Sequence, residues 1–158
     1  MGGAVIRKAG AADLAAVDAI ERSSFNAVDC FAKRNLKRLL ASDSADLLLA
    51  ECEGRPAGYV LLLFRKGAKA ARLYSLATAP DARGKGVGPA LVEAAAARAI
   101  KRGCDRLRLE VRLSNAAAIG LYERAGFQTL KMTPNYYDDG EGALMMERRL
   151  EAERRVAE

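Results

Sequence analysis

The sequence contains no histidine and no tryptophan, and it has only three cysteines in 158 residues. Without histidine the chain lacks the most common metal ligand and the most common general base, so proton transfer must use Glu, Asp, Tyr, Lys or Cys. The cysteines, Cys30, Cys52 and Cys104, are odd in number and far apart. This spacing indicates neither a disulfide framework nor a Cys-x-x-Cys metal site, and we expect no bound metal.

Long apolar runs are also missing from the sequence. No segment approaches the roughly 20 apolar residues that a membrane-spanning helix needs. Residues 1–6 lack the basic start of a signal peptide. We therefore expect a cytoplasmic protein that does not associate with membranes.

The length and the even composition of the chain predict a single domain. Of the 158 residues, 51% are hydrophobic, which is sufficient for one core. No repeat or low-complexity linker divides the sequence, so we assign residues 1–150 to one domain and residues 151–158 to a C-terminal tail. The sequence is compatible with a homodimer.

The net charge of +6 is compatible with a nucleic acid, an anionic membrane surface or an anionic cofactor as the partner. The basic residues lie in separate groups along the chain, and no basic strip interleaved with aromatic residues emerges. This distribution disfavours nucleic-acid binding. An anionic cofactor fits the most distinctive motif in the sequence.

That motif is the glycine-rich turn Arg83-Gly84-Lys85-Gly86-Val87-Gly88, which follows an apolar strand and opens an alanine-rich helix. Alternating glycines allow close approach of the backbone to a ligand, and the helix N-terminus attracts phosphate. The turn is not a P-loop, because Pro89 stands where Lys-Ser/Thr should follow, and its last glycine interval is too short for a dinucleotide fingerprint. A glycine-rich turn with solvated basic residues is the alternative interpretation.

Periodicity and turn residues predict a mixed α/β order. Asp13 is the expected N-cap of the first helix, and the turn at residues 53–56 is expected to join a hairpin. The predicted strands are residues 5–8, 47–52, 58–64, 71–78, 107–111, 127–131 and 143–148, and the predicted helices are 13–23, 33–40, 88–102 and 115–125.

Two motifs together resemble the GNAT superfamily of N-acetyltransferases. Arg83-x-x-Gly86-x-Gly88 is similar to the acyl-CoA pyrophosphate loop of that superfamily, and the segment LRLEVRLSNAAAIGLYERAGF at 107–127 resembles the bacterial ribosomal-protein-alanine N-acetyltransferases. With Asn135-Tyr136-Tyr137 and residues 143–147, the likeness covers about residues 71–148. The resemblance implies an α/β (α+β) GNAT fold, a mixed and mostly antiparallel sheet of about six to seven strands flanked by about four helices.

The resemblance also implies an acetyl-CoA site, in which strand main chain pairs with the pantetheine arm and the turn holds the pyrophosphate. It places Glu110 as general base and Tyr122 as general acid. The implied acetyl-CoA contacts are Leu76, Ala77, Thr78, Arg83, Gly84, Lys85, Gly86, Val87, Gly88, Pro89, Asn115 and Tyr122. Pro89 offers no amide to a phosphate, although proline is at home in a first helical turn.

The chemistry of acetyl transfer to an amine agrees with these implied roles. An α-amine with a pKa of about 8 is roughly one-tenth neutral at pH 7, so a carboxylate such as Glu110 is an adequate base, directly or through one water. Each residue also has a purely structural alternative. Glu110 could pair with Arg108 or Arg112 on the same strand face, Tyr122 could be a packed core residue, and Asn115 could simply cap a helix.

The acceptor is less well defined by the sequence. Phe25, Asp29, Tyr136 and Tyr137 are the expected acceptor contacts, and residues 25–35 lack the Phe-Pro-Trp character of the ribosomal-protein branch. The acidic loop at 136–141, aided by residues 43–46, would suit a cationic amine or basic peptide end, but it could equally be a polar hairpin loop. A protein or peptide N-terminus reacting directly in a ternary complex is the leading interpretation; a small-molecule amine acetyltransferase and a non-catalytic CoA sensor are the alternatives.

Overall fold

The computed structural model describes residues 3–24 and 33–151. Within this part, one seven-stranded sheet has the order β1-β2-β3-β4-β5-β7-β6. Only β4 and β5 pair in parallel, so the predicted mixed, mostly antiparallel sheet is confirmed. The strands are β1 Val5–Lys8, β2 Ala45–Cys52, β3 Arg55–Leu63, β4 Ala70–Thr78, β5 Arg106–Arg112, β6 Gln128–Thr133 and β7 Ala143–Arg149.

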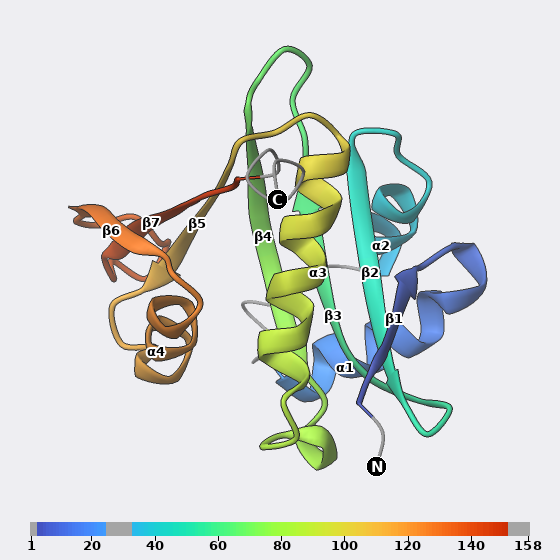
Figure 1. The fold of residues 1–158 in the computed structure, drawn as a ribbon. Coiled ribbons are helices and arrows are strands. Elements are labelled where there is room, and N and C mark those ends of the chain that lie inside the picture. The colour runs from blue at the N-terminus through green and yellow to red at the C-terminus, as the bar shows by residue number, and fades with distance from the viewer. Residues whose placement is uncertain (1–2, 25–32, 152–158) are drawn as a thin grey trace.

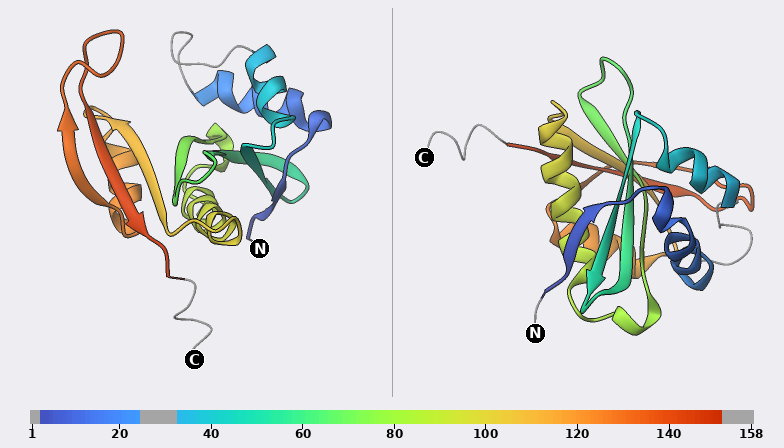
Figure 2. Two further views of the ribbon diagram at one scale, coloured as in Figure 1. Left: turned by 90° about the horizontal axis from the view of Figure 1, so that it is seen from above. Right: turned by 90° about the vertical axis from the view of Figure 1, so that its right-hand side faces the viewer.

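Helices flank both faces of the sheet. Helix α3 lies against one face, and α1 and α2 lie against the other (Figures 1 and 2). The expected four helices are present in the described part, with short 3-10 turns before α1 and α3. They are α1 Leu14–Ser24, α2 Lys33–Leu40, α3 Val87–Lys101 and α4 Ala116–Arg124, and the turns are Ala11–Asp13 and Pro80–Ala82.

The sheet divides where β4 meets β5. The two strands pair only from Ala70 to Arg72 on β4 and from Arg106 to Arg108 on β5. Beyond these residues they diverge, and Figure 2 shows β5, β7 and β6 standing apart from β1–β4. The later part of β4 therefore has main-chain groups with no neighbouring strand on the β5 side, and these groups can pair with a ligand.

A β-bulge lies in the divergent part of β4. Leu61 of β3 pairs with Ser75 and Leu62 pairs with Leu73, so Tyr74 is the extra residue. The bulge interrupts the alternation of β4 and leaves Tyr74 44% exposed at the divergence. Bulges change the direction of side chains locally, and here the change occurs beside the gap between the strands.

Strand β5 has a strict alternation of buried and partly exposed residues. Leu107, Leu109 and Val111 are buried on the helix-covered face, while the charged residues between them lie on the opposite face. The apolar set packs against α3. It thereby fixes Glu110 on the open face.

An ion cluster joins α3 to the first two strands. Asp46 of β2 is fully buried and contacts Arg98 at 2.6 Å, Lys8 at 3.2 Å and Arg102 at 3.3 Å. Burial alone would raise the pKa of Asp46, but the hydrogen bonds and charges of Arg98 and Lys8 outweigh it and lower the pKa. Asp46 thus serves the fold and is not available to bind an acceptor amine.

Two local expectations are corrected by the structure. Asp13 does not cap α1, because it ends the 3-10 turn and its carboxylate accepts hydrogen bonds from the Gly10 amide and the Arg7 guanidinium. The hairpin turn is shorter than expected. Glu53 and Gly54, with φ values of 53° and 77°, form it alone, and β3 begins at Arg55.

The cysteines, the C-terminal tail and the expected lack of membrane-spanning helices and metal sites can be compared with the structure only over the described residues. Cys30 and residues 152–158 of the expected tail lie outside the described part, whereas Cys52 and Cys104 are free thiols. No helix in residues 3–24 and 33–151 has both the length and the apolar character to cross a bilayer. In the same residues, acidic and cysteine side chains do not gather in groups suited to a metal.

We expect Gly58→Ala to destabilise the fold by about 1–3 kcal/mol. An added Cβ would lie 2.7 Å from the Ala77 carbonyl oxygen, 3.1 Å from Val87 and 3.2 Å from Leu91, so β4 and α3 would both have to move. Urea denaturation measures the change. Gly10→Ala is the matched control, because its Cβ would meet nothing within 4 Å; equal stabilities of the two variants would contradict this packing.

Candidate active site

A cleft of about 450 Å³ lies between the divergent strands β4 and β5 and helix α4. Its walls combine residues that the sequence placed in three separate motifs. Six predicted site residues line it, namely Leu76, Glu110, Asn115, Tyr122, Tyr136 and Tyr137. The structure thus brings the predicted base, the predicted acid and two predicted acceptor contacts around one space.

Glu110 is held by an arginine from the neighbouring strand. Its side chain is 15% exposed, and Oε1 lies 2.8 Å from Nη2 of Arg72 on β4. Arg108 and Arg112, the partners considered from sequence, bind other carboxylates. No described residue hydrogen-bonds Oε2 of Glu110, so this oxygen can accept a proton while Arg72 fixes the carboxylate.

Tyr122 of α4 is both a packed residue and a cleft residue. It is 6% exposed, and its ring packs edge-on against Phe127 with centroids 5.5 Å apart. Burial, with a smaller contribution from Tyr137, raises the pKa of Tyr122 to about 12. The hydroxyl therefore keeps its proton throughout the neutral range and can act as a proton donor.

The glycine-rich turn has the predicted backbone geometry of an anion cradle. Gly84 and Gly86 both have φ of 79°, a conformation that favours glycine, and Gly86 is the N-cap of α3. Ala90 is the first residue of the helix to donate back to Gly86, which leaves the amides of Val87 and Gly88 for a ligand. Pro89 has no amide to add.

The turn lies close to two of the elements that form the cleft. A Cβ on Gly88 would be 3.5 Å from Leu121 of α4 and 4.0 Å from the Thr78 hydroxyl of β4. The space that a side chain would fill at Gly88 therefore adjoins the end of β4 and the helix that carries Tyr122. An elongated ligand with phosphates on the turn can extend along β4 into the cleft.

Asn115 caps α4 and also lines the cleft. Its Oδ1 accepts the Ala118 amide at 3.1 Å. Capping uses the carbonyl end of the side chain and leaves the amide nitrogen for a ligand. The structural and functional interpretations of Asn115 are thus compatible.

Tyr136 and Tyr137 form the outer wall of the cleft. Their rings lie 5.0 Å apart, the Tyr136 hydroxyl accepts from Arg72 at 3.2 Å, and the Arg112 guanidinium stacks 4.1 Å from the Tyr137 ring. The neighbouring acidic residues are engaged locally. Asp139 and Glu141 each lie 2.9 Å from Arg112. These ion pairs favour the interpretation of the segment as a polar hairpin loop over that of an acidic site for the acceptor.

The pKa values of these loop carboxylates agree with that engagement. A hydrogen bond from the Glu141 amide lowers the pKa of Asp139, and the contact with Arg112 lowers it further by a smaller amount. Hydrogen bonds from Ser114 and Arg112 lower the pKa of Glu141. Both carboxylates stay ionised at neutral pH and tie the loop to the end of β5.

A hydrogen-bonded chain that the sequence does not indicate reaches the cleft. Ser75 lines the cleft, and its Oγ lies 3.1 Å from the hydroxyl of buried Tyr59, which hydrogen-bonds to buried Glu21 of α1. The sequence does not show that Tyr59 and Glu21 meet, because that contact depends on how α1 packs on β3.

The remaining predicted site residues fall outside the described part or outside the cleft. Phe25 and Asp29 lie outside the described residues, so their predicted acceptor contacts stay predictions. Ala77 is 4% exposed and Val87 is 2% exposed, so only their main chain could contact a ligand. Arg83 and Lys85 are exposed on the turn and are not part of the cleft wall.

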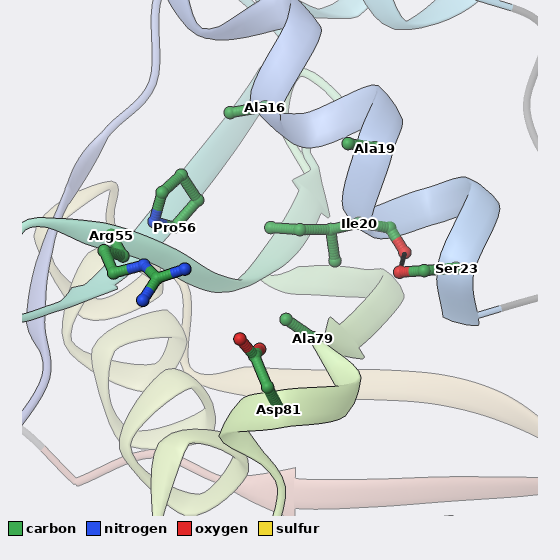
Figure 3. A pocket seen from close by; sticks show the side chains of 8 residues that line it. All are labelled: Ala16, Ala19, Ile20, Ser23, Arg55, Pro56, Ala79 and Asp81. Atoms are coloured by element: carbon green, nitrogen blue, oxygen red, sulfur yellow. Dashed lines mark hydrogen bonds between the residues drawn. The ribbon is translucent and has the colours of Figure 1, made fainter.

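A smaller pocket of about 250 Å³ lies on the α1 side of the sheet (Figure 3). The Ser23 hydroxyl donates within α1 to the Ile20 carbonyl, and the side chains of Arg55 and Asp81 extend toward the same space. None of the residues around Glu110 and Tyr122 takes part in it. Its lining is Ala16, Ala19, Ile20, Ser23, Arg55, Pro56, Ala79 and Asp81.

Comparison with known proteins identifies the family of the chain. Residues 14–127 match the model of the acetyltransferase (GNAT) family. An uncharacterised N-acetyltransferase of Methanocaldococcus jannaschii is 34% identical over 143 residues, 90% of this chain and 89% of the relative. The ribosomal protein bS18-alanine N-acetyltransferase of Escherichia coli K12 is 46% identical over 79 residues, which span 48% of this chain and 53% of that enzyme.

The fold is also shared with a solved structure. The crystal structure of the ribosomal-protein-S18-alanine N-acetyltransferase from Escherichia coli aligns with a TM-score of 0.82 and 30% identity, over 93% of this chain and 94% of that one. The protein is therefore an N-acetyltransferase. It belongs to the GNAT family, whose enzymes take the acetyl group from acetyl-CoA.

Proposed function

We propose that the protein transfers the acetyl group of acetyl-CoA to the α-amine of a protein or peptide N-terminus, by direct attack in a ternary complex. The observation that carries the proposal is that Glu110 and Tyr122 line one cleft and that the glycine-rich turn lies close to the elements that form it. The names of the bacterial relatives, which describe action on the alanine of a ribosomal protein, support an N-terminal acceptor.

The residues that would hold acetyl-CoA fit its parts. The Val87 and Gly88 amides and the side chains of Arg83 and Lys85 suit the pyrophosphate. The main chain of β4 near Leu76 and Thr78, which pairs with β3 but has no strand partner on the β5 side, suits the amides of the pantetheine arm. Acetyl-CoA supplies a thioester whose carbonyl is open to attack by an amine.

Three side chains have distinct roles in the proposed transfer. Oε2 of Glu110 takes a proton from the acceptor amine, while Arg72 holds Oε1 and keeps the carboxylate in position. Tyr122 donates its proton to the departing sulfur. Because its pKa is about 12, this donation is effective only if burial also raises the basicity of the thiolate, as a closed cleft would do.

The donor assignment predicts the behaviour of the turn. Replacing both Arg83 and Lys85 with alanine should raise the KM for acetyl-CoA about threefold to tenfold with little change in kcat, because exposed charges contribute binding common to ground and transition states. Initial rates at varied acetyl-CoA concentration measure this KM.

The control that removes the same charge is Arg34→Ala with Lys37→Ala on α2. If the KM for acetyl-CoA rises equally in the control, the effect comes from the net charge of the protein and not from the turn.

The acceptor assignment is tested with a panel of amines. We expect a free-N-terminal peptide to exceed spermidine, glucosamine and free alanine in kcat/KM by about tenfold or more, because the cleft is wide enough to make contacts beyond the amine. Thiol release measures the rates, and calorimetry measures CoA binding. Higher activity with a small amine would favour a small-molecule enzyme, and CoA binding without turnover of any amine would favour a sensor.

A further inference from the structure

A second cleft of about 520 Å³ adjoins the first one on the open face of the sheet. The two clefts share Arg72 and Glu110 in their walls. The second cleft extends from Glu110 back along the paired part of β4 and β5, where Met145 of β7 and the β3–β4 connection also line it. A chain whose amine reaches Glu110 can therefore continue into this space.

The second cleft carries an excess of positive charge. Its lining contains one carboxylate, Glu110, and the basic residues are Arg65, Lys69, Arg72, Arg106 and Arg108. Neighbouring acidic residues neutralise only part of this set. Glu147 lies 3.3 Å from Arg108 and 4.0 Å from Arg106, and Asp105 lies 2.9 Å from Arg106.

Arg65 and Lys69 provide the surplus. Both are exposed, and no carboxylate within residues 3–24 and 33–151 forms an ion pair with either of them. The fold does not need their charges, because their structural contacts are made by the backbone: the Arg65 carbonyl accepts from Ala68, and the Lys69 carbonyl accepts from Asp105. Their charges are therefore available to an anionic ligand.

Helices leave this face of β5 accessible. Helices α1 and α2 pack on β2, β3 and β4, and α3 lies on the opposite face. Arg106 and Arg108 are 33% and 42% exposed, so they are oriented by the strand and still reach solvent. Arginines fixed on a strand present donors suited to carboxylates.

We propose that this cationic cleft binds acidic side chains of the acceptor, downstream of the amine that is acetylated. The inference rests on the proposed N-terminal acetyltransferase function and names the substrate class. Arg108 and Arg106 precede Glu110 by two and four residues, which is about 7 and 13 Å along a strand. An extended acceptor with its amine at Glu110 has the same rise, so its third and fifth residues reach the part of the cleft that these arginines line together with Arg65 and Lys69.

The test compares three peptides that differ only at positions three and five, which carry aspartate, asparagine or lysine. With the wild-type protein we expect the aspartate peptide to exceed the asparagine peptide about threefold to tenfold in kcat/KM, mainly through KM, and the lysine peptide to be slowest. The preference should shrink in about 0.5 M salt, where exposed charges are screened.

The double variant Arg65→Glu with Lys69→Glu tests where the preference arises. It should abolish or reverse the order of the three peptides, and the change should appear mainly in KM. Lys37→Glu with Lys101→Glu changes the net charge equally at sites outside both clefts and should keep the wild-type order.

The outcomes separate this inference from the proposed function. If peptides are acetylated without an acidic preference, or if the double variant keeps the preference, the cationic cleft is not the acceptor site although the function stands. If no peptide is acetylated, the proposed function fails. Fluorescence anisotropy then measures whether the aspartate peptide binds to the cationic cleft. Binding that is lost in the double variant would support the cleft, and absence of binding would overturn it.

Discussion

Replacing Glu110 with glutamine is expected to lower kcat for peptide acetylation by about a hundredfold to ten-thousandfold, the usual contribution of a general base. Glutamine has nearly the same shape as glutamate but cannot take a proton from the amine. Arg72 loses a charged partner at 2.8 Å, yet both side chains reach solvent, so the fold should persist. Acetyl-CoA affinity should be unchanged, because Glu110 is the proposed base for the acceptor amine and is not among the proposed acetyl-CoA contacts.

The control for this variant is Glu51→Gln. Glu51 is also a partly buried strand glutamate paired with an arginine, Arg7, at 3.4 Å, but it lies on β2 away from the cleft. Its substitution should leave kcat within about twofold. An equal loss in the two variants would mean that removing an ion pair, and not removing the base, lowers the rate.

The pH profile of the Glu110→Gln variant separates catalysis from structure. An α-amine with a pKa of about 8 goes from roughly one-tenth neutral at pH 7 to about nine-tenths neutral at pH 9. A variant that lacks only the base should recover up to about tenfold over this range. A damaged fold would give no such recovery.

Replacing Tyr122 with phenylalanine is expected to lower kcat about a hundredfold or more, because the departing thiolate loses its proton donor. Phenylalanine keeps the ring contact with Phe127, so the melting temperature should change little. The KM for acetyl-CoA should rise less than kcat falls. Stopped-flow detection of free thiol in a single turnover measures the chemical step.

Two observations check the assignment of Tyr122. Tyr74→Phe removes a hydroxyl from the wall of the same cleft and should leave kcat nearly unchanged. Since the pKa of Tyr122 is raised to about 12, its proton is present below that pH, and the wild-type rate should not fall between pH 8 and pH 10 from loss of this acid. A drop in that range that disappears in Tyr122→Phe would show a much lower pKa and revise the role.

The sequence predicted much of this architecture, because its pattern is locally consistent. The pattern at residues 107–111 predicted β5, one residue short at each end, and its charged face, and the helices predicted at 88–102 and 115–125 each stop before a glycine, Gly103 and Gly126. The glycine spacing at the turn indicated a backbone that a ligand can approach closely, and the structure gives Gly84 and Gly86 the positive φ values that favour glycine. These features depend on nearby residues, and nearby residues are visible in the sequence.

Features that depend on distant contacts were not predictable in the same way. The Arg72 partner of Glu110 arises from the short parallel pairing of β4 with β5, and the bulge at Tyr74 has no glycine to mark it. Asp46 belongs to an acidic segment, and only the packing of α3 shows that Arg98 neutralises it. The sequence alone therefore does not show whether the acidic segments carry charge that is free to contact an acceptor, because their ion-pair partners lie far away in the chain.

The most direct test of the central claim is acetylation of one peptide in two blocked forms, with the modified nitrogen located by tandem mass spectrometry. One form has a free α-amine and a blocked lysine, and the other has a blocked α-amine and a free lysine. We predict thiol release from acetyl-CoA and one acetyl group on the α-nitrogen of the first form only, with the signal lost in Glu110→Gln at pH 7. Acetylation of the lysine form alone, or full activity of Glu110→Gln, would contradict the account.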